Sequence, residues 1–137
     1  MTALYTATAW ATNGREGSVK SEDGIIDLQL SMPKALGGTG AAGTNPEQLF
    51  AAGYSACFGS ALKLVANKLK LDASQVVISA KVSLVPESTG FGLSVELIGS
   101  APNLTREQLT GLMDKAHGVC PYSKATKGNM PVTLSVA

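Results

Sequence analysis

The sequence contains few of the residue types from which common reaction centres are built. It has two cysteines, Cys57 and Cys120, and a single histidine, His117, among 137 residues. These three could ligate zinc, but the chain has no second closely spaced ligand pair, which argues against a zinc site. A thiol hydrolase or acyltransferase would have to use His117 as its base, and the stretch Gly53–Cys57 lacks the final glycine of a nucleophile elbow.

An excess of charge of one sign is also absent. The chain has 11 basic and 10 acidic residues and a net charge of +1, which gives no basic face for nucleic acid. Its longest uncharged apolar stretch, residues 48–62, has about 15 residues, and a bilayer span needs about 20. The first residues do not resemble a signal peptide. We therefore expect a cytoplasmic protein without a nucleic-acid or membrane partner.

The composition is that of an ordinary globular protein, with 45% hydrophobic and 15% charged residues. A chain of this length fits one domain, residues 1–137. Alternating apolar residues, turn dipeptides and helix-start signals predict an α+β order with an N-terminal antiparallel meander and a glycine-rich loop over residues 33–44. The predicted strands cover residues 4–12, 17–22, 25–30, 75–85, 91–98 and 132–136, and the predicted helices residues 45–71, 105–117 and 121–126.

The long helix predicted over residues 45–71 is apolar or small on nearly every face. Asn45 or Thr44 can cap it, Pro46 suits its first turn, and Glu47 complements the positive end of its dipole. A helix that is apolar all round is buried on all sides. Because a chain of this size has trouble enclosing such a helix alone, we expect a second subunit to cover it.

Cys120 precedes Pro121, which predicts that the cysteine caps a short helix. Free backbone N–H groups and the helix dipole at that position favour an anion, so the pKa of the thiol would fall. The alternative is a small, half-buried residue that happens to precede a turn. The local residues leave both interpretations open.

Cys57 lies in the middle of the apolar helix, where a free cysteine is most simply explained as core packing. A thiol in apolar surroundings has a raised pKa and stays inert unless a cation lies nearby. Arg15, in the first hairpin turn, is the candidate cation, and Glu47 is the carboxylate that could hold it. Arg15 could equally be a solvated turn residue and Glu47 a residue that favours a helix start.

Two segments resemble the motifs of one known family. The stretch NPEQLFAAGYSACFGSAL around Cys57 and the stretch VCPYSKATKGN around Cys120 are similar to those of the Ohr/OsmC family. The VCPYS form resembles the organic hydroperoxide resistance (Ohr) branch. The opening LYTATAWATNGREGSV, the segment DGIIDLQLSMPKALGGTGAAGTNPEQ and the closing strand are similar too, so the resemblance covers the whole chain. Lys127 stands where the family pattern has arginine, which puts no catalytic residue in doubt.

The resemblance implies a role for four residues. Cys57 matches the cysteine that attacks the peroxide, Cys120 the resolving cysteine, Arg15 the arginine that activates the thiolate, and Glu47 the glutamate that holds this arginine. It also implies an OsmC/Ohr-like fold, with antiparallel sheets around a long central helix in an intertwined homodimer. Members reduce organic hydroperoxides, hold no cofactor or metal, and are re-reduced by dihydrolipoamide or a lipoylated protein.

Three points stay open at this level. We predict Met32, Leu36, Phe50 and Phe58 as substrate-pocket residues. Ten residues separate Glu47 from Cys57, which is about 15 Å along a straight helix, so the helix bends, begins near Gly53, or Glu47 serves the partner subunit. The rival functions are a thiol hydrolase, which His117→Ala would abolish, and a redox-sensing or ligand-binding dimer, whose thiols would oxidise without turnover.

Overall fold

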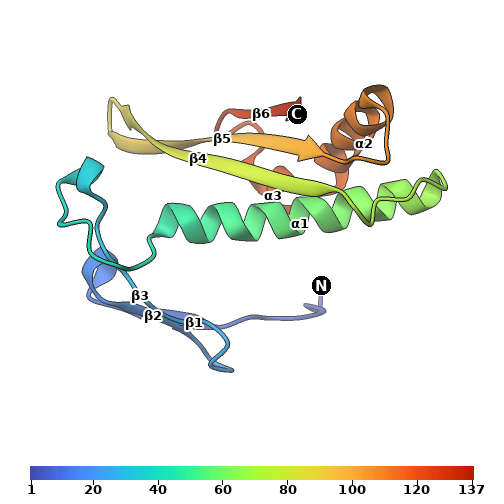
Figure 1. Ribbon diagram of the computed structural model, residues 1–137. Coiled ribbons are helices and arrows are strands. Elements are labelled where there is room, and N and C mark those ends of the chain that lie inside the picture. Colours follow the sequence, from blue (N-terminus) through green and yellow to red (C-terminus); the bar gives the residue numbers. More distant parts are fainter. The chain divides into compact units, whose positions relative to one another are not determined.

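Two three-stranded sheets and three α-helices make up this protein (Figure 1). The computed structural model describes all 137 residues, in two compact units, Met1–Leu49 and Phe50–Ala137. The α+β class predicted from the sequence is confirmed.

The first unit contains the predicted meander, with sheet order β1-β2-β3. Its strands are antiparallel: β1 (Ala9–Thr12), β2 (Ser18–Ser21) and β3 (Asp27–Gln29). The strand predicted over residues 4–12 is shorter in the structure, because the pairing of β1 with β2 begins only at Ala9, opposite Ser21 at the end of β2.

The turn between β1 and β2 is tight enough to require glycine. Asn13 adopts the left-handed conformation, with φ of 58°, and opens the 3₁₀ turn Gly14–Glu16, which carries Arg15. A Cβ at Gly17 would lie 1.8 Å from the Thr12 carbonyl oxygen, so no other residue fits there without a shift of the backbone. The turn therefore fixes where Arg15 leaves the sheet.

Helix α1 (Pro46–Lys68) is the longest element, with 23 residues. Gln48 N donates to Asn45 Oδ1 over 2.8 Å, which identifies Asn45 as the cap and is worth about 1 kcal/mol. The helix begins at Pro46 and continues through Gly53, so it does not begin near Gly53, which was one of the three alternatives. It ends before the predicted Leu71 because Lys70 turns left-handed, with φ of 57°.

Helix α1 is long and apolar enough to cross a membrane, by length and composition alone. One of its faces instead belongs to the core of the second unit, through Tyr54, Phe58, Ala61, Leu62 and Ala66. A core helix passes the same test of length and composition. The homodimer stays a prediction.

The second sheet has the order β4-β5-β6. Strands β4 (Val77–Glu87) and β5 (Gly90–Ser100) form a long antiparallel hairpin that ends at the pair Glu87 and Gly90. Strand β6 (Val132–Val136) pairs with β5 in parallel, so this sheet is mixed rather than antiparallel throughout. The reason is that two helices intervene between β5 and β6, and a crossover of that length permits parallel pairing.

Helices α2 (Arg106–Val119) and α3 (Pro121–Thr126) form that crossover. Residues 105–108 have the form of a capping box, and the structure confirms that the box of Thr105 and Gln108 is present. The helix was predicted to end at residue 117, before Gly118, but it continues to Val119, and Cys120 N donates to the Ala116 carbonyl over 2.8 Å. The core of this unit joins α1, β5, α2 and Cys120; its buried residues are Tyr54, Phe58, Ala61, Leu62, Ala66, Val95, Leu97, Leu109, Leu112, Met113, Ala116 and Cys120.

Candidate active site

The two cysteines lie against each other in the second unit. The Cys120 thiol donates to the Cys57 sulfur over 3.5 Å, and both are free thiols. Cys120 is fully buried and Cys57 is half-buried. A disulfide has an S–S length of about 2.05 Å, so the sulfur atoms need approach by only about 1.5 Å to form one.

The backbone at Cys120 explains this placement. Cys120 ends α2 through its N–H and begins α3 through its carbonyl, which accepts from Lys124 N over 3.0 Å. Its φ and ψ of −62° and 124° are extended, and Pro121 takes the first helical position. The predicted cap position is therefore confirmed. The thiol makes no cap bond of its own and is directed at Cys57 instead.

The surroundings of Cys57 disfavour its thiolate. Burial raises the pKa of the Cys57 thiol above its ordinary value, and the neighbouring Cys120 side chain raises it further. The backbone N–H of Tyr122 has the opposite effect, because its hydrogen bond favours the charged sulfur. The net direction is upward, so Cys57 needs a cation to react as a thiolate at neutral pH.

An apolar cavity of about 520 Å³ adjoins this thiol pair through Tyr122. Its lining residues are Phe50, Leu93, Pro121, Tyr122, Ala125, Thr126, Asn129 and Met130. Tyr122 packs closely against α1, and Gly53 makes room for it: a Cβ at Gly53 would lie 2.8 Å from the Tyr122 hydroxyl oxygen. Phe50, a predicted pocket residue, is one of these lining residues, and Leu93 and Met130 line the same cavity from distant parts of the chain.

The other three predicted pocket residues lie elsewhere. Phe58 is 0% exposed and belongs to the core. Met32 lines a separate cavity of about 430 Å³ beside the glycine-rich loop of the first unit. Leu36 is exposed at the end of the 3₁₀ turn Lys34–Leu36. Their role in substrate binding stays a prediction.

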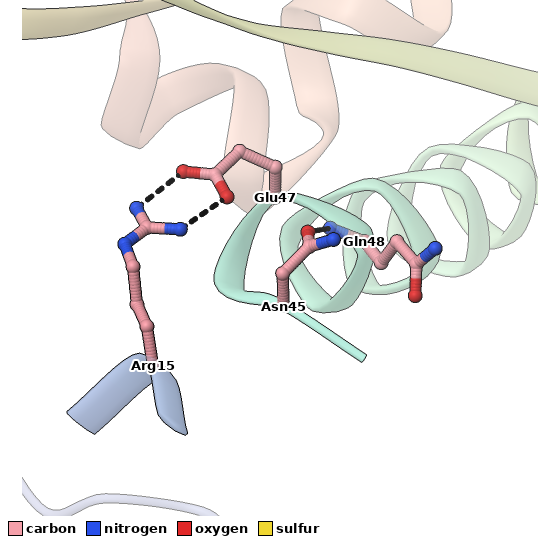
Figure 2. Close-up of polar contacts among 4 residues, drawn as sticks. All are labelled: Arg15, Asn45, Glu47 and Gln48. Carbon is pink, nitrogen blue, oxygen red and sulfur yellow. Dashed lines mark hydrogen bonds and ion pairs between the residues drawn. The ribbon is translucent and has the colours of Figure 1, made fainter. Parts of the chain in front are cut away.

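Arg15 and Glu47 form a two-bond ion pair in the first unit (Figure 2). Both guanidinium nitrogens donate to the carboxylate over 2.7 Å. The hydrogen bond to Glu47 raises the pKa of Arg15, and the bond from Arg15 lowers the pKa of Glu47. Paired nitrogen and oxygen atoms fix the plane of the guanidinium, which is how arginine is oriented at anion sites. The pairing suggested by the sequence is present, and its part in catalysis stays a prediction.

No group of three or more histidine, cysteine, aspartate and glutamate side chains in this chain is placed to hold a metal ion. A buried polar cluster that the sequence analysis missed does lie near the thiols. Tyr54, Ser123 and Thr126 contact one another there, and His117 contacts Ser123. Tyr54 precedes Cys57 by three residues and Ser123 follows Cys120 by three, but no local feature of the sequence marks either residue.

The fold and the site together define an α+β dithiol protein, in which a helix and a helix junction bring two reduced thiols within reach of a disulfide. Comparison with known families gives the next step. The family model described as OsmC-like protein matches residues 38–135. The chain belongs to this family, and the resemblance noted in the sequence is confirmed.

Similar proteins cover nearly the whole chain. The organic hydroperoxide resistance protein of Xanthomonas axonopodis pv. citri is 54% identical over 98% of this chain and 95% of its own length. An organic hydroperoxide resistance protein structure from Legionella pneumophila has a TM-score of 0.92 and 49% identity, covering 99% of both chains. The OhrB structure of Bacillus subtilis has a TM-score of 0.89 and 45% identity, covering 98% of this chain and 100% of its own. The predicted Ohr/OsmC-like fold is confirmed.

The ion pair gives a prediction about pH. The carboxyl of Glu47 titrates below its ordinary value in the folded protein, and Arg15→Ala moves its pKa upward. The pKa of Glu47 is lower in the folded protein than in the unfolded chain. The stabilisation from the pair is therefore complete at pH values above the unfolded pKa, and it is lost as the pH falls through the folded pKa. Carbon-13 NMR of the Glu47 carboxyl group measures its pKa in the wild type and in Arg15→Ala. Arg106→Ala is the control, and equal Glu47 titration in wild type and Arg15→Ala would contradict the assignment.

Proposed function

We propose that this protein is a cysteine-based peroxidase that reduces organic hydroperoxides to alcohols and serves in the response to oxidative stress. The observation that carries the proposal is the contact between the Cys57 and Cys120 sulfur atoms, at 3.5 Å. The relatives that cover almost the whole chain are named for organic hydroperoxide resistance. A reduced dithiol is what a thiol-dependent reduction of a peroxide requires.

In the first step the Cys57 thiolate attacks the O–O bond. The distal oxygen stays on sulfur as a sulfenic acid, and the other oxygen leaves as an alcohol after it takes up a proton. Because burial raises the pKa of Cys57, we assign Arg15 as the cation that stabilises the thiolate and the developing negative charge on the leaving oxygen. Glu47 holds the guanidinium in its orientation.

In the second step Cys120 condenses with the sulfenic acid. This forms a Cys57–Cys120 disulfide and releases water. An external dithiol, dihydrolipoamide or a lipoylated protein, then reduces the disulfide, and no bound cofactor takes part. Such a cycle suits the cytoplasm, where reduced thiols persist.

The apolar cavity beside Tyr122 supports a preference for alkyl or lipid hydroperoxides over hydrogen peroxide. Burial of a hydrocarbon chain contributes about 0.8 kcal/mol per methylene group, and hydrogen peroxide has none. Phe50 lines this cavity. Met32, Leu36 and Phe58 remain our other proposed substrate residues.

We also propose that the Arg15–Glu47 pair of one subunit serves Cys57 of the partner subunit in a homodimer. Helix α1 is unbroken between Glu47 and Cys57, and ten residues of straight helix span about 15 Å. An Arg15 guanidinium held by Glu47 would have to span most of this length to contact Cys57 of the same chain. The exposed face of α1, which includes Leu64 at 54%, is the surface that a partner would cover.

The two cysteines have separable phenotypes. Cys57→Ser removes the attacking atom and lowers consumption of cumene hydroperoxide, with dihydrolipoamide as reductant, to the background rate. Cys120→Ser keeps the first attack, so without added dithiol it consumes one equivalent of peroxide and stops with Cys57 as a sulfenic acid. Mass spectrometry identifies the products. If the wild type forms no Cys57–Cys120 disulfide, or consumes no peroxide catalytically, the proposed function is wrong.

Mixed dimers test the shared site. Cys57→Ser and Glu47→Ala subunits are each inactive as homodimers under this proposal. In a heterodimer of the two, both defects fall in one site and the other site is complete. The heterodimer therefore recovers up to about half of the wild-type activity per dimer. Tagged subunits purified as heterodimers provide the sample. Heterodimers without activity would exclude the trans arrangement. The matched control is a dimer prepared with the same tags in which both subunits carry Cys57→Ser.

A further inference from the structure

A chain of buried hydroxyl groups beside the thiols ties α1, α2 and α3 together. Tyr54 OH lies 2.8 Å from Ser123 Oγ and 3.2 Å from Thr126 Oγ1. His117 Nδ1 lies 2.8 Å from Ser123 Oγ, and the Thr126 hydroxyl donates to the Ser123 carbonyl over 3.1 Å. Tyr54, Ser123 and Thr126 are 0%, 1% and 5% exposed, so water does not replace these bonds.

Only one arrangement of protons makes all four contacts hydrogen bonds, because each hydroxyl has a single proton. The Thr126 proton goes to the carbonyl of Ser123, so Tyr54 donates to Thr126. Ser123 then donates to Tyr54, and its remaining contact must receive a proton from His117. The network therefore assigns a proton to Nδ1 of His117.

This network brackets both cysteines. Tyr54 lies three residues before Cys57 on the same side of α1. His117 and Ser123 lie three residues before and three after Cys120, on α2 and α3. The Tyr54–Ser123 bond therefore joins the two segments whose sulfur atoms are in contact, and the His117–Ser123 bond closes the bend at Cys120.

We propose that Tyr54, Ser123 and His117 are positioning residues that hold Cys120 against Cys57 for disulfide formation. The proposal rests on the peroxidase function above. In this step the Cys120 sulfur attacks the sulfenic sulfur of Cys57. The S–S bond forms, the S–O bond breaks, and the hydroxyl leaves as water with the thiol proton of Cys120.

Holding Cys120 in place matters because a second reaction competes for the same intermediate. Another molecule of hydroperoxide converts the sulfenic acid to a sulfinic acid, which ordinary thiols do not reduce. The intramolecular reaction wins when the thiol is held near its target, since the effective concentration of an oriented group is high. Loosening the network therefore favours the irreversible product.

The proton assignment is tested on the reduced protein without peroxide. Since His117 is the only histidine, nitrogen-15 NMR of the imidazole is free of overlap. The neutral ring is expected to carry its proton on Nδ1 in wild type, and to lose this preference in Ser123→Ala. A neutral ring protonated on Nε2 in wild type overturns the network.

The positioning role is tested in a single turnover. Reduced protein is mixed with cumene hydroperoxide, dimedone traps the remaining sulfenic acid, and mass spectrometry follows the products. Ser123→Ala and Tyr54→Phe each slow disulfide formation about five- to tenfold, which is the effect expected from the loss of one hydrogen bond. The first attack on peroxide keeps its rate, and the sulfinic acid fraction rises.

Two further variants separate positioning from a general loss of structure. The double variant slows the step by less than the product of the two single effects, because both single changes remove the same bond. His117→Asn keeps an N–H group near the position of Nδ1, so it forms the disulfide faster than His117→Leu. Ser55→Ala is the control on α1, because its hydroxyl bonds only to the Ala51 carbonyl of its own helix, and it behaves as wild type.

The outcomes are distinguishable. Folded Ser123→Ala and Tyr54→Phe proteins that form the disulfide at the wild-type rate overturn the positioning role, as do single effects that simply multiply. Tyr54→Phe, which loses one oxygen atom, carries the test if Ser123→Ala fails to fold. A wild type that forms neither sulfenic acid nor disulfide overturns the peroxidase function itself.

Discussion

The burial of Cys57 on an apolar helix is the constraint on which the proposed chemistry depends. Burial places the thiol beside Cys120 and an apolar cavity, which suits a hydrocarbon substrate. The same burial raises the pKa of the thiol and so lowers the fraction of reactive thiolate. A buried nucleophile therefore requires a charge from elsewhere, and this requirement is the reason why we propose Arg15 as the cation.

The two requirements of the proposed reaction, charge and position, fall to different parts of the chain. In our proposal the charge comes from Arg15, whose guanidinium is oriented by two hydrogen bonds to Glu47. The position of Cys120 is set by a helix junction and by hydroxyl groups with no charge. Hydroxyl groups are suited to this task, because a carboxylate near Cys57 would raise the pKa of its thiol further.

Local signals in the sequence predicted most of the local structure. The Thr105 capping box and the cap position of Cys120 each depend on a few adjacent residues, and both were correct. For the cap of α1 the sequence offered Asn45 or Thr44, and the structure selects Asn45. The parallel pairing of β6 with β5 was missed because it depends on a crossover of more than thirty residues, roughly the length of a βαβ unit. The end of α1 was missed because Lys70 is not a residue type that commonly turns left-handed.

The site was predictable to a similar degree. The residues themselves singled out Cys57, Cys120, Arg15 and Glu47, but the roles that we propose for them came from the resemblance, because local residues left the role of each cysteine open. The contact between the two sulfur atoms and the hydroxyl network were beyond reach, since they depend on how α1 packs against α3. Tyr54 and Ser123 have no local signature, because a tyrosine or serine within a helix is most often a packing or surface residue.

The most direct test of the account is the pKa of the Cys57 thiol in the assembled protein. Ultraviolet absorbance of the thiolate, in a Cys120→Ser background that leaves one thiol, measures it in the presence and absence of Arg15. The account predicts a pKa below the ordinary cysteine value with Arg15 and a pKa above it in Arg15→Ala. Equal values in the two proteins would contradict the claim that Arg15 offsets the burial of Cys57.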